Sequence, residues 1–123
     1  MKKKVLIIDD SRDLTETLEY LLKSEGYKAM SAHNYKEGVT KALHKSPDLI
    51  LLDVFLPKPD GYSICEELKN SVNTKDIKII IMSGQAREEG AVLAELSKAN
   101  KYIYKPFDND SLCNDIRLSL IHI

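Results

Sequence analysis

Three short, almost entirely apolar segments constrain the fold of this chain more than any other feature of its sequence. They are KVLII at residues 4–8, LILLD at 49–53 and IKIIIM at 77–82. An apolar run of this length is typical of a strand buried on both faces, as in a parallel sheet that helices cover on both sides. Two weaker runs, YKAMSA at 27–32 and KYIY at 101–104, are expected to form the outer strands.

The segments between these runs carry apolar residues at helical spacing, so each is predicted to form a helix with one face toward the sheet. Gly26 is expected to end the first helix, and Asn34, with Glu37 three residues later, to begin the second. Asp108 and Asp110 give the last helix an acidic start, which suits the positive end of a helix dipole. The predicted inward-facing residues are Leu14, Leu18, Leu21 and Leu22; Val39, Ala42 and Leu43; Ile64, Leu68 and Val72; Val92, Leu93 and Leu96; and Leu112, Ile116 and Leu120.

Five strands that alternate with five helices over short connections predict a doubly wound parallel α/β sheet. The commonest strand order for such a sheet is 2-1-3-4-5, the flavodoxin-like (βα)5 arrangement, in which ligands bind outside the carboxyl ends of the strands. The chain has 123 residues, which is near the common size of one domain. We therefore expect a single domain over residues 1–123.

Composition excludes several classes of function. The net charge of −1 gives no reason to expect nucleic acid or an anionic membrane as a partner. No segment approaches the ~18 apolar residues of a membrane span, and the basic start MKKK is followed only by VLII, which is too short for a signal peptide. Cys65 and Cys113 lie far apart without metal-ligand spacing, which favours a reducing, cytoplasmic location.

Polar residues follow four of the predicted strands, always at the same end. They are Asp9 and Asp10 after the first strand, Asp53 at the end of the third, Ser83 and Gly84 after the fourth, and Lys105 and Pro106 after the fifth. In a parallel sheet these side chains lie together. Three carboxylates in one cleft favour a hard divalent cation such as Mg²⁺ or Mn²⁺. With a lysine and a hydroxyl beside them they could steady a phosphoryl group, with Asp53 as a carboxylate nucleophile and Gly84 leaving room for the incoming group.

Each of these signals also has a structural interpretation when taken alone. An aspartate at a strand end is commonly a cap or turn residue, and Asp10 or Ser11 could cap the first helix. A Lys–Pro pair after a strand is common where a strand ends in a turn or loop. The joint placement of all of them at one edge of the sheet favours a functional site.

The segments VLIIDDS, PDLILLDVFLPKPDG, IIIMSG and YIYKPF resemble the receiver domain of response regulators in bacterial two-component signalling, with a chemotaxis-regulator-like organisation. The resemblance covers essentially the whole chain. Ser83 precedes Lys105 by 22 positions, as is usual in that family. The resemblance implies a signalling phosphoacceptor, not an enzyme with a separate substrate.

The resemblance also implies a role for each site residue. Asp53 would accept a phosphoryl group from a partner histidine kinase or histidine phosphotransfer protein. Asp10, Asp53 and the backbone carbonyl of Phe55 would bind Mg²⁺ directly, and Asp9 mainly through water. Lys105 would pair with the phosphoryl oxygens, and the bond from Lys105 to Pro106 would be cis.

A conformational response is implied as well. The hydroxyl of Ser83 would follow the phosphoryl group, and Tyr102 would respond as the switch aromatic. The face formed by the fourth helix, the fifth strand and the fifth helix would then change its preference for a downstream effector. Because Phe55 cannot orient an attacking water, slow autodephosphorylation is expected. His33, His44 and His122 are expected at the surface away from the acidic edge, so the donor histidine belongs to another protein.

Two other functions remain open on this sheet. One is a Mg²⁺-dependent phosphohydrolase with an aspartyl nucleophile, although such enzymes generally have a second acid where this chain has Phe55. The other is a flavodoxin-like cofactor binder. It would need a Gly, Ser or Thr phosphate-binding loop after the first strand, whereas DDSRD would repel a phosphate.

Overall fold

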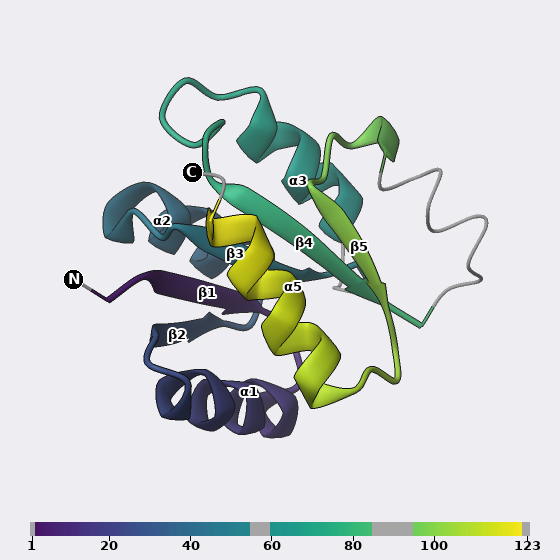
Figure 1. Ribbon diagram of the computed structural model, residues 1–123. Coiled ribbons are helices and arrows are strands. Elements are labelled where there is room, and N and C mark those ends of the chain that lie inside the picture. Colours follow the sequence, from purple (N-terminus) through teal and green to yellow (C-terminus); the bar gives the residue numbers. More distant parts are fainter. Residues whose placement is uncertain (1, 55–59, 85–94, 122–123) are drawn as a thin grey trace.

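The computed structural model describes residues 2–54, 60–84 and 95–121, which form a central sheet covered by helices on both faces (Figure 1). The elements are β1 (Lys4–Ile8), α1 (Arg12–Ser24), β2 (Lys28–Ala32), α2 (Tyr35–Lys45), β3 (Leu49–Asp53), α3 (Gly61–Lys69), β4 (Lys78–Ser83), β5 (Lys101–Tyr104) and α5 (Asn109–Ile121). All neighbouring strands pair in parallel, in the order β2-β1-β3-β4-β5. The predicted fold class and strand order are confirmed.

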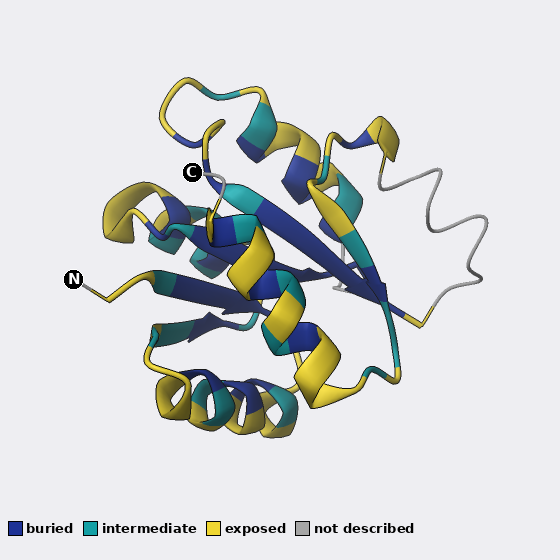
Figure 2. Ribbon diagram, in the orientation of Figure 1, coloured by how far each residue is buried: buried dark blue, intermediate teal, exposed yellow. Residues whose placement is uncertain are grey.

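Alternate residues of the central strands point to opposite faces of the sheet, and both faces are buried (Figure 2). Val5 and Ile7 of β1 pack on the side of α1 and α5, whereas Leu6 and Ile8 pack on the side of α2 and α3. This double burial is why the strands read as unbroken apolar runs. The buried helical residues are Leu18, Leu22, Leu112, Ile116 and Leu120 on the first side, and Ala42, Ile64, Cys65 and Leu68 on the second.

The helices begin where their capping residues predict. Asn34 accepts a hydrogen bond from the amide of Glu37 at 2.8 Å at the start of α2. Asp108 accepts one from the amide of Ser111 at 3.0 Å at the start of α5. Gly26 follows the end of α1 with a φ of +94°, a conformation that suits glycine. None of the described helices has both the length and the apolar character that a membrane span requires.

Three of the predicted inward-facing residues are exposed. Val72 is 81% exposed because α3 ends at Lys69, so the helical periodicity no longer applies. Leu43 is 44% exposed because α2 approaches the sheet through Gly38 and Ala42, which leaves the next position turned partly outward. Leu96 is also largely exposed, and the other two apolar residues predicted for the fourth helix, Val92 and Leu93, lie outside the described residues.

The end of α2 contains backbone strain that a substitution can relieve. Ser46 has φ 48° and ψ 58°, the left-handed conformation that side chains with a Cβ adopt at a cost. Replacing Ser46 by glycine should raise the free energy of unfolding by about 0.5–1 kcal/mol, measured by urea denaturation. Ser46→Ala retains the Cβ and should give no gain. An equal gain in both variants would contradict the assignment to backbone strain.

Candidate functional site

The polar residues predicted at the strand ends are held in place by hydrogen bonds that continue beyond the strands. The amide of Asp9 donates to the carbonyl of Ala32 at 3.1 Å. The amide of Lys105 donates to the carbonyl of Ser83 at 2.7 Å. Asp53 lies opposite Met82 in the register of β3 and β4. The backbone at this edge is therefore a direct extension of the sheet.

The three carboxylates among the predicted metal ligands converge. Asp9, Asp10 and Asp53 each offer a carboxylate oxygen, and these atoms lie within 4.8 Å of one another. Asp9 and Asp53 are buried and Asp10 is exposed, so the cluster opens to solvent on one side. Carboxylate oxygens at this spacing fit a hard divalent cation that retains some of its water.

Lys105 is the cation that joins the buried part of this cluster. Its Nζ lies 3.1 Å from Oδ2 of Asp9 and 3.5 Å from Oδ1 of Asp53. One ammonium beside three ionised carboxylates leaves these four side chains with a net charge of −2. A buried carboxylate needs compensating partners, and a divalent cation would supply the missing charge.

Asp9 already has a partner on each oxygen. Its Oδ1 accepts a hydrogen bond from the amide of Ser11 at 2.9 Å, and its Oδ2 accepts one from Lys105. The carboxylate of Asp10 has the greater solvent access. This division fits direct metal contact for Asp10 and a contact through water for Asp9.

Ser83 lies at the end of β4, fully buried, with Tyr62 of α3 as a neighbour that sequence reasoning missed. Burial, followed by the nearby Tyr102, raises the pKa of Tyr62, whereas a hydrogen bond with Ser83 works in the opposite direction. The hydroxyl of Tyr102 is buried and makes no hydrogen bond of ordinary geometry within the described residues. Its ring lies 4.6 Å from that of Tyr104 between centroids. The predicted hydroxyl and switch residues therefore share one neighbour, Tyr62.

Gly61 determines how closely the start of α3 approaches Asp53. Its amide donates to the carbonyl of Val54 at 3.2 Å. A Cβ at this position would lie 2.4 Å from the backbone oxygen of Asp53 and 2.5 Å from Cα of Val54. By contrast, a Cβ at Gly84 would meet nothing within 4 Å. The bond from Lys105 to Pro106 is cis.

Two further sequence predictions have different outcomes. Phe55, whose carbonyl is a predicted metal ligand, lies outside the described residues. His33, predicted at the surface, is half-buried: its side chain is 19% exposed and its Nε2 lies 3.0 Å from the hydroxyl of Thr15. The strand order could have predicted the position of His33. Because β2 lies beside β1, the end of β2 lies next to the end of β1, where Asp9 and Asp10 are found.

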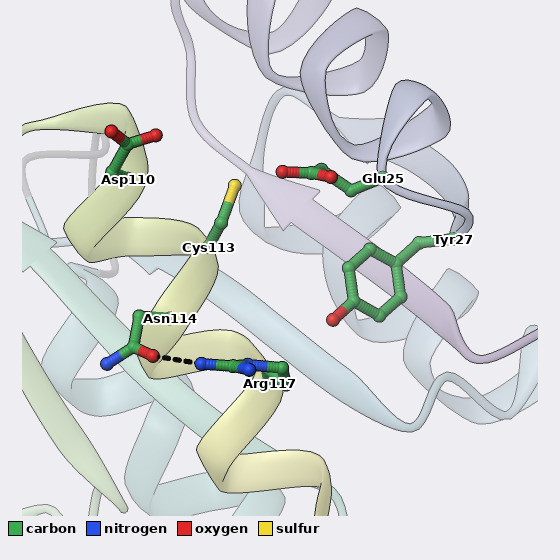
Figure 3. A pocket seen from close by; sticks show the side chains of 6 residues that line it. All are labelled: Glu25, Tyr27, Asp110, Cys113, Asn114 and Arg117. Carbon is green, nitrogen blue, oxygen red and sulfur yellow. Dashed lines mark hydrogen bonds between the residues drawn. The ribbon is translucent and has the colours of Figure 1, made fainter.

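The molecule also has a cavity of about 340 Å³ between the end of α1 and α5 (Figure 3). It is lined by Glu25, Tyr27, Asp110, Cys113, Asn114 and Arg117. Burial and the neighbouring Glu25 raise the pKa of the Cys113 thiol, and a protonated thiol is a poor nucleophile and metal ligand. None of the predicted site residues lines this cavity. The candidate site is therefore identified by the polar residues at the strand ends and not by the position of this cavity.

Comparison with known proteins finds a match over nearly the whole chain. The family model described as response regulator receiver domain matches residues 5–117. A receiver domain protein from Methanospirillum hungatei is 28% identical, with a TM-score of 0.92 over 99% of this chain and 96% of that chain. A two-component response regulator from Clostridium difficile is 26% identical, with a TM-score of 0.90 over 97% and 96%. The signal receiver domain of a histidine kinase from Syntrophus aciditrophicus is 28% identical, with a TM-score of 0.91 over 98% and 92%.

The two glycines at this edge provide a matched test of the packing around Asp53. Gly61→Ala should lower the free energy of unfolding by about 1–3 kcal/mol, because the added methyl group meets backbone atoms that cannot move aside. Gly84→Ala should change it by less than about 0.5 kcal/mol, because the space there is open. Urea denaturation of both variants measures the difference. Equal effects would show that the close approach of Gly61 to Asp53 is not what limits this position.

Proposed function

The chain belongs to the response regulator receiver domain family, and we propose on that basis that it is a phosphorylation-controlled switch. Asp53 accepts a phosphoryl group from a histidine of a partner kinase or phosphotransfer protein, in a reaction that depends on Mg²⁺. The observation that carries this proposal is the buried carboxylate of Asp53, paired with Lys105 and clustered with Asp9 and Asp10 at the carboxyl edge of the sheet.

Asp53 would act as the nucleophile. One of its carboxylate oxygens attacks the phosphorus of the donor phosphohistidine, an O–P bond forms, and the N–P bond breaks. The electron pair of that bond returns to the imidazole nitrogen of the donor. Lys105, within ion-pair distance of Asp53, would stabilise the negative charge of the phosphoryl oxygens as they approach.

Asp9, Asp10 and Asp53 would hold the divalent cation, together with the backbone carbonyl of Phe55 that the resemblance implies. When bound, Mg²⁺ would supply positive charge to the phosphoryl oxygens and offset the repulsion among the carboxylates. The net charge of −2 on the cluster and Lys105 is the feature of this chain that supports a cation there.

Phosphorylation would be transmitted through the hydroxyl of Ser83. Ser83 lies beside Tyr62, which in turn neighbours Tyr102. A phosphoryl group on Asp53 would attract the Ser83 hydroxyl, and the altered contacts of Tyr62 would allow Tyr102 to change position. The face predicted from the fourth helix, β5 and α5 would then change its preference for a downstream effector protein or domain.

The location that best fits these features is the cytoplasm. Cys65 and Cys113 are both free thiols, as is usual for proteins kept in a reducing compartment. The histidine kinase or phosphotransfer protein would be met there. No direct contact with nucleic acid or with a membrane is part of this proposal, and the net charge of −1 gives no reason for one.

A mass measurement tests the proposed reaction. The protein is incubated with Mg²⁺ and a small acyl-phosphate donor, and its mass is determined. The wild type should gain one phosphoryl group, because Asp53 is positioned to attack. Asp53→Asn should gain none, because the amide is not a nucleophile, and chelation of Mg²⁺ should also prevent the gain.

An adduct that persists in Asp53→Asn would contradict the assignment of the phosphoacceptor. Continuous release of phosphate from a phosphate monoester, over many turnovers per protein molecule, would favour the alternative of a phosphohydrolase. Serine in place of Thr17 provides a control, since this exposed α1 residue bonds only within its helix among the contacts described. Thr17→Ser should gain the phosphoryl group as the wild type does.

The lifetime of the aspartyl phosphate is a separate prediction that rests on the sequence. The side chain of Phe55 has no hydrogen-bonding group and cannot orient an attacking water. Phe55→Asn should therefore shorten the half-life of the phosphorylated protein roughly tenfold, a modest effect for a positioned polar group. Loss of the adduct is followed by mass spectrometry, with Phe55→Leu as the apolar control. A half-life in Phe55→Asn as long as that of the wild type would contradict the prediction.

A further inference from the structure

The stretch from the end of β1 to the first turn of α1, which carries Asp9 and Asp10, is held at both ends by consecutive residues at the end of β2. At the first end, the amide of Asp9 donates to the carbonyl of Ala32 at 3.1 Å. At the second end, Thr15 Oγ1 lies 3.0 Å from Nε2 of His33. Residues 32 and 33 therefore contact the chain on either side of Asp10, at Asp9 and at Thr15.

The direction of the bond between Thr15 and His33 depends on which ring nitrogen of His33 carries the proton. With a proton on Nε2, the ring donates to Thr15, whose own hydroxyl donates to the carbonyl of Arg12 at 3.1 Å. With a proton on Nδ1, the hydroxyl of Thr15 donates to Nε2. Thr15 is 1% exposed, so in either case this bond has little competition from water.

Glu37 holds the other side of the His33 residue. The amide of His33 donates to Oε1 of Glu37 at 2.6 Å, and Nδ1 of the ring lies 3.4 Å from the same oxygen. Lys41 lies 4.0 Å from the second oxygen of Glu37. The imidazole is thus oriented from two sides, with Nε2 directed at α1.

The first turn of α1 connects Thr15 to the carboxylates. The amide of Thr15 donates to the carbonyl of Ser11 at 3.0 Å, and the amide of Ser11 donates to Oδ1 of Asp9 at 2.9 Å. A displacement of this turn from β2 would move both the backbone of Asp10 and the donor that orients Asp9. Ligand positions in metal sites depend on such outer contacts.

We propose that His33 is a positioning residue for the aspartates that bind the divalent cation, acting through Thr15 and the first turn of α1. This inference rests on the proposed function, because it assumes that Asp9 and Asp10 bind Mg²⁺. His33 contributes Nε2, whose hydrogen bond with Thr15 holds the loop in place. A purely structural role would make His33 important for stability without any effect on cation affinity.

The test is the affinity of the whole chain for Mg²⁺, measured by calorimetry or from backbone amide shifts in NMR spectra. His33→Leu and Thr15→Val each remove one side of the hydrogen bond and should weaken Mg²⁺ binding roughly tenfold, the low end of the effect of outer contacts in metal sites. His33→Gln and Thr15→Ser keep a donor and a hydroxyl, and should bind within about threefold of the wild type. The double variant His33→Leu with Thr15→Val should be no weaker than either single variant, because both remove the same bond.

His44 supplies the matched control, because it is an exposed histidine late in α2. His44→Leu should bind Mg²⁺ as the wild type does. Urea denaturation of each variant measures stability in parallel. A loss of stability in His33→Leu with unchanged Mg²⁺ affinity would overturn the proposal and leave a structural role.

Two other results would also overturn it. Equal weakening in His33→Leu and His33→Gln would show that the hydrogen bond with Thr15 is not what matters. A wild type that binds no Mg²⁺ would contradict the proposed function itself, and the inference with it. Because wild-type binding is measured first, the two failures are distinguished.

Discussion

The arrangement at the edge of the sheet depends on one electrostatic constraint: three carboxylates must share a small volume with a single ammonium group. Asp9 and Asp53 are almost fully buried, and both lie within 3.5 Å of Lys105. Without a rigid support, these charged side chains would turn toward solvent, because burying a charge is unfavourable. The cluster stays together because the carboxylates lie at the ends of β1 and β3, whose residues are buried on both faces of the sheet and cannot move without exposing the core. The hydrophobic sheet is therefore the rigid support for a charge distribution that a flexible loop could not maintain.

The strands could be predicted from the sequence because burial on both faces leaves no polar interruption in β1, β3 and β4. The helix starts were predictable for a local reason, since capping residues such as Asn34 bond with amides three residues away. Val72 and Leu43 were misjudged because spacing alone does not tell where a helix ends or how closely it approaches its neighbours. Gly38 shows the second point: a Cβ there would lie 2.8 Å from Cδ1 of Ile8.

The candidate site was predictable to the extent that topology determines it. Parallel strands bring their carboxyl ends together, so Asp9, Asp53 and Lys105 could be grouped before any geometry was known. The contacts of Tyr62 with Ser83 and of His33 with Thr15 depend on side-chain direction across two elements. No periodicity encodes such contacts. They are also the contacts by which the surrounding structure can influence the site.

The ion pair between Lys105 and Asp9 joins residues that are 96 positions apart in the chain. Contacts of such long sequence separation require loop closure over most of the molecule, and they tend to form late and slowly in folding. No fragment that ends before β5 can contain the pair. The ion pair that compensates the buried carboxylate of Asp9 should therefore form only once the last strand has joined the sheet, so that a chain still emerging from the ribosome lacks it.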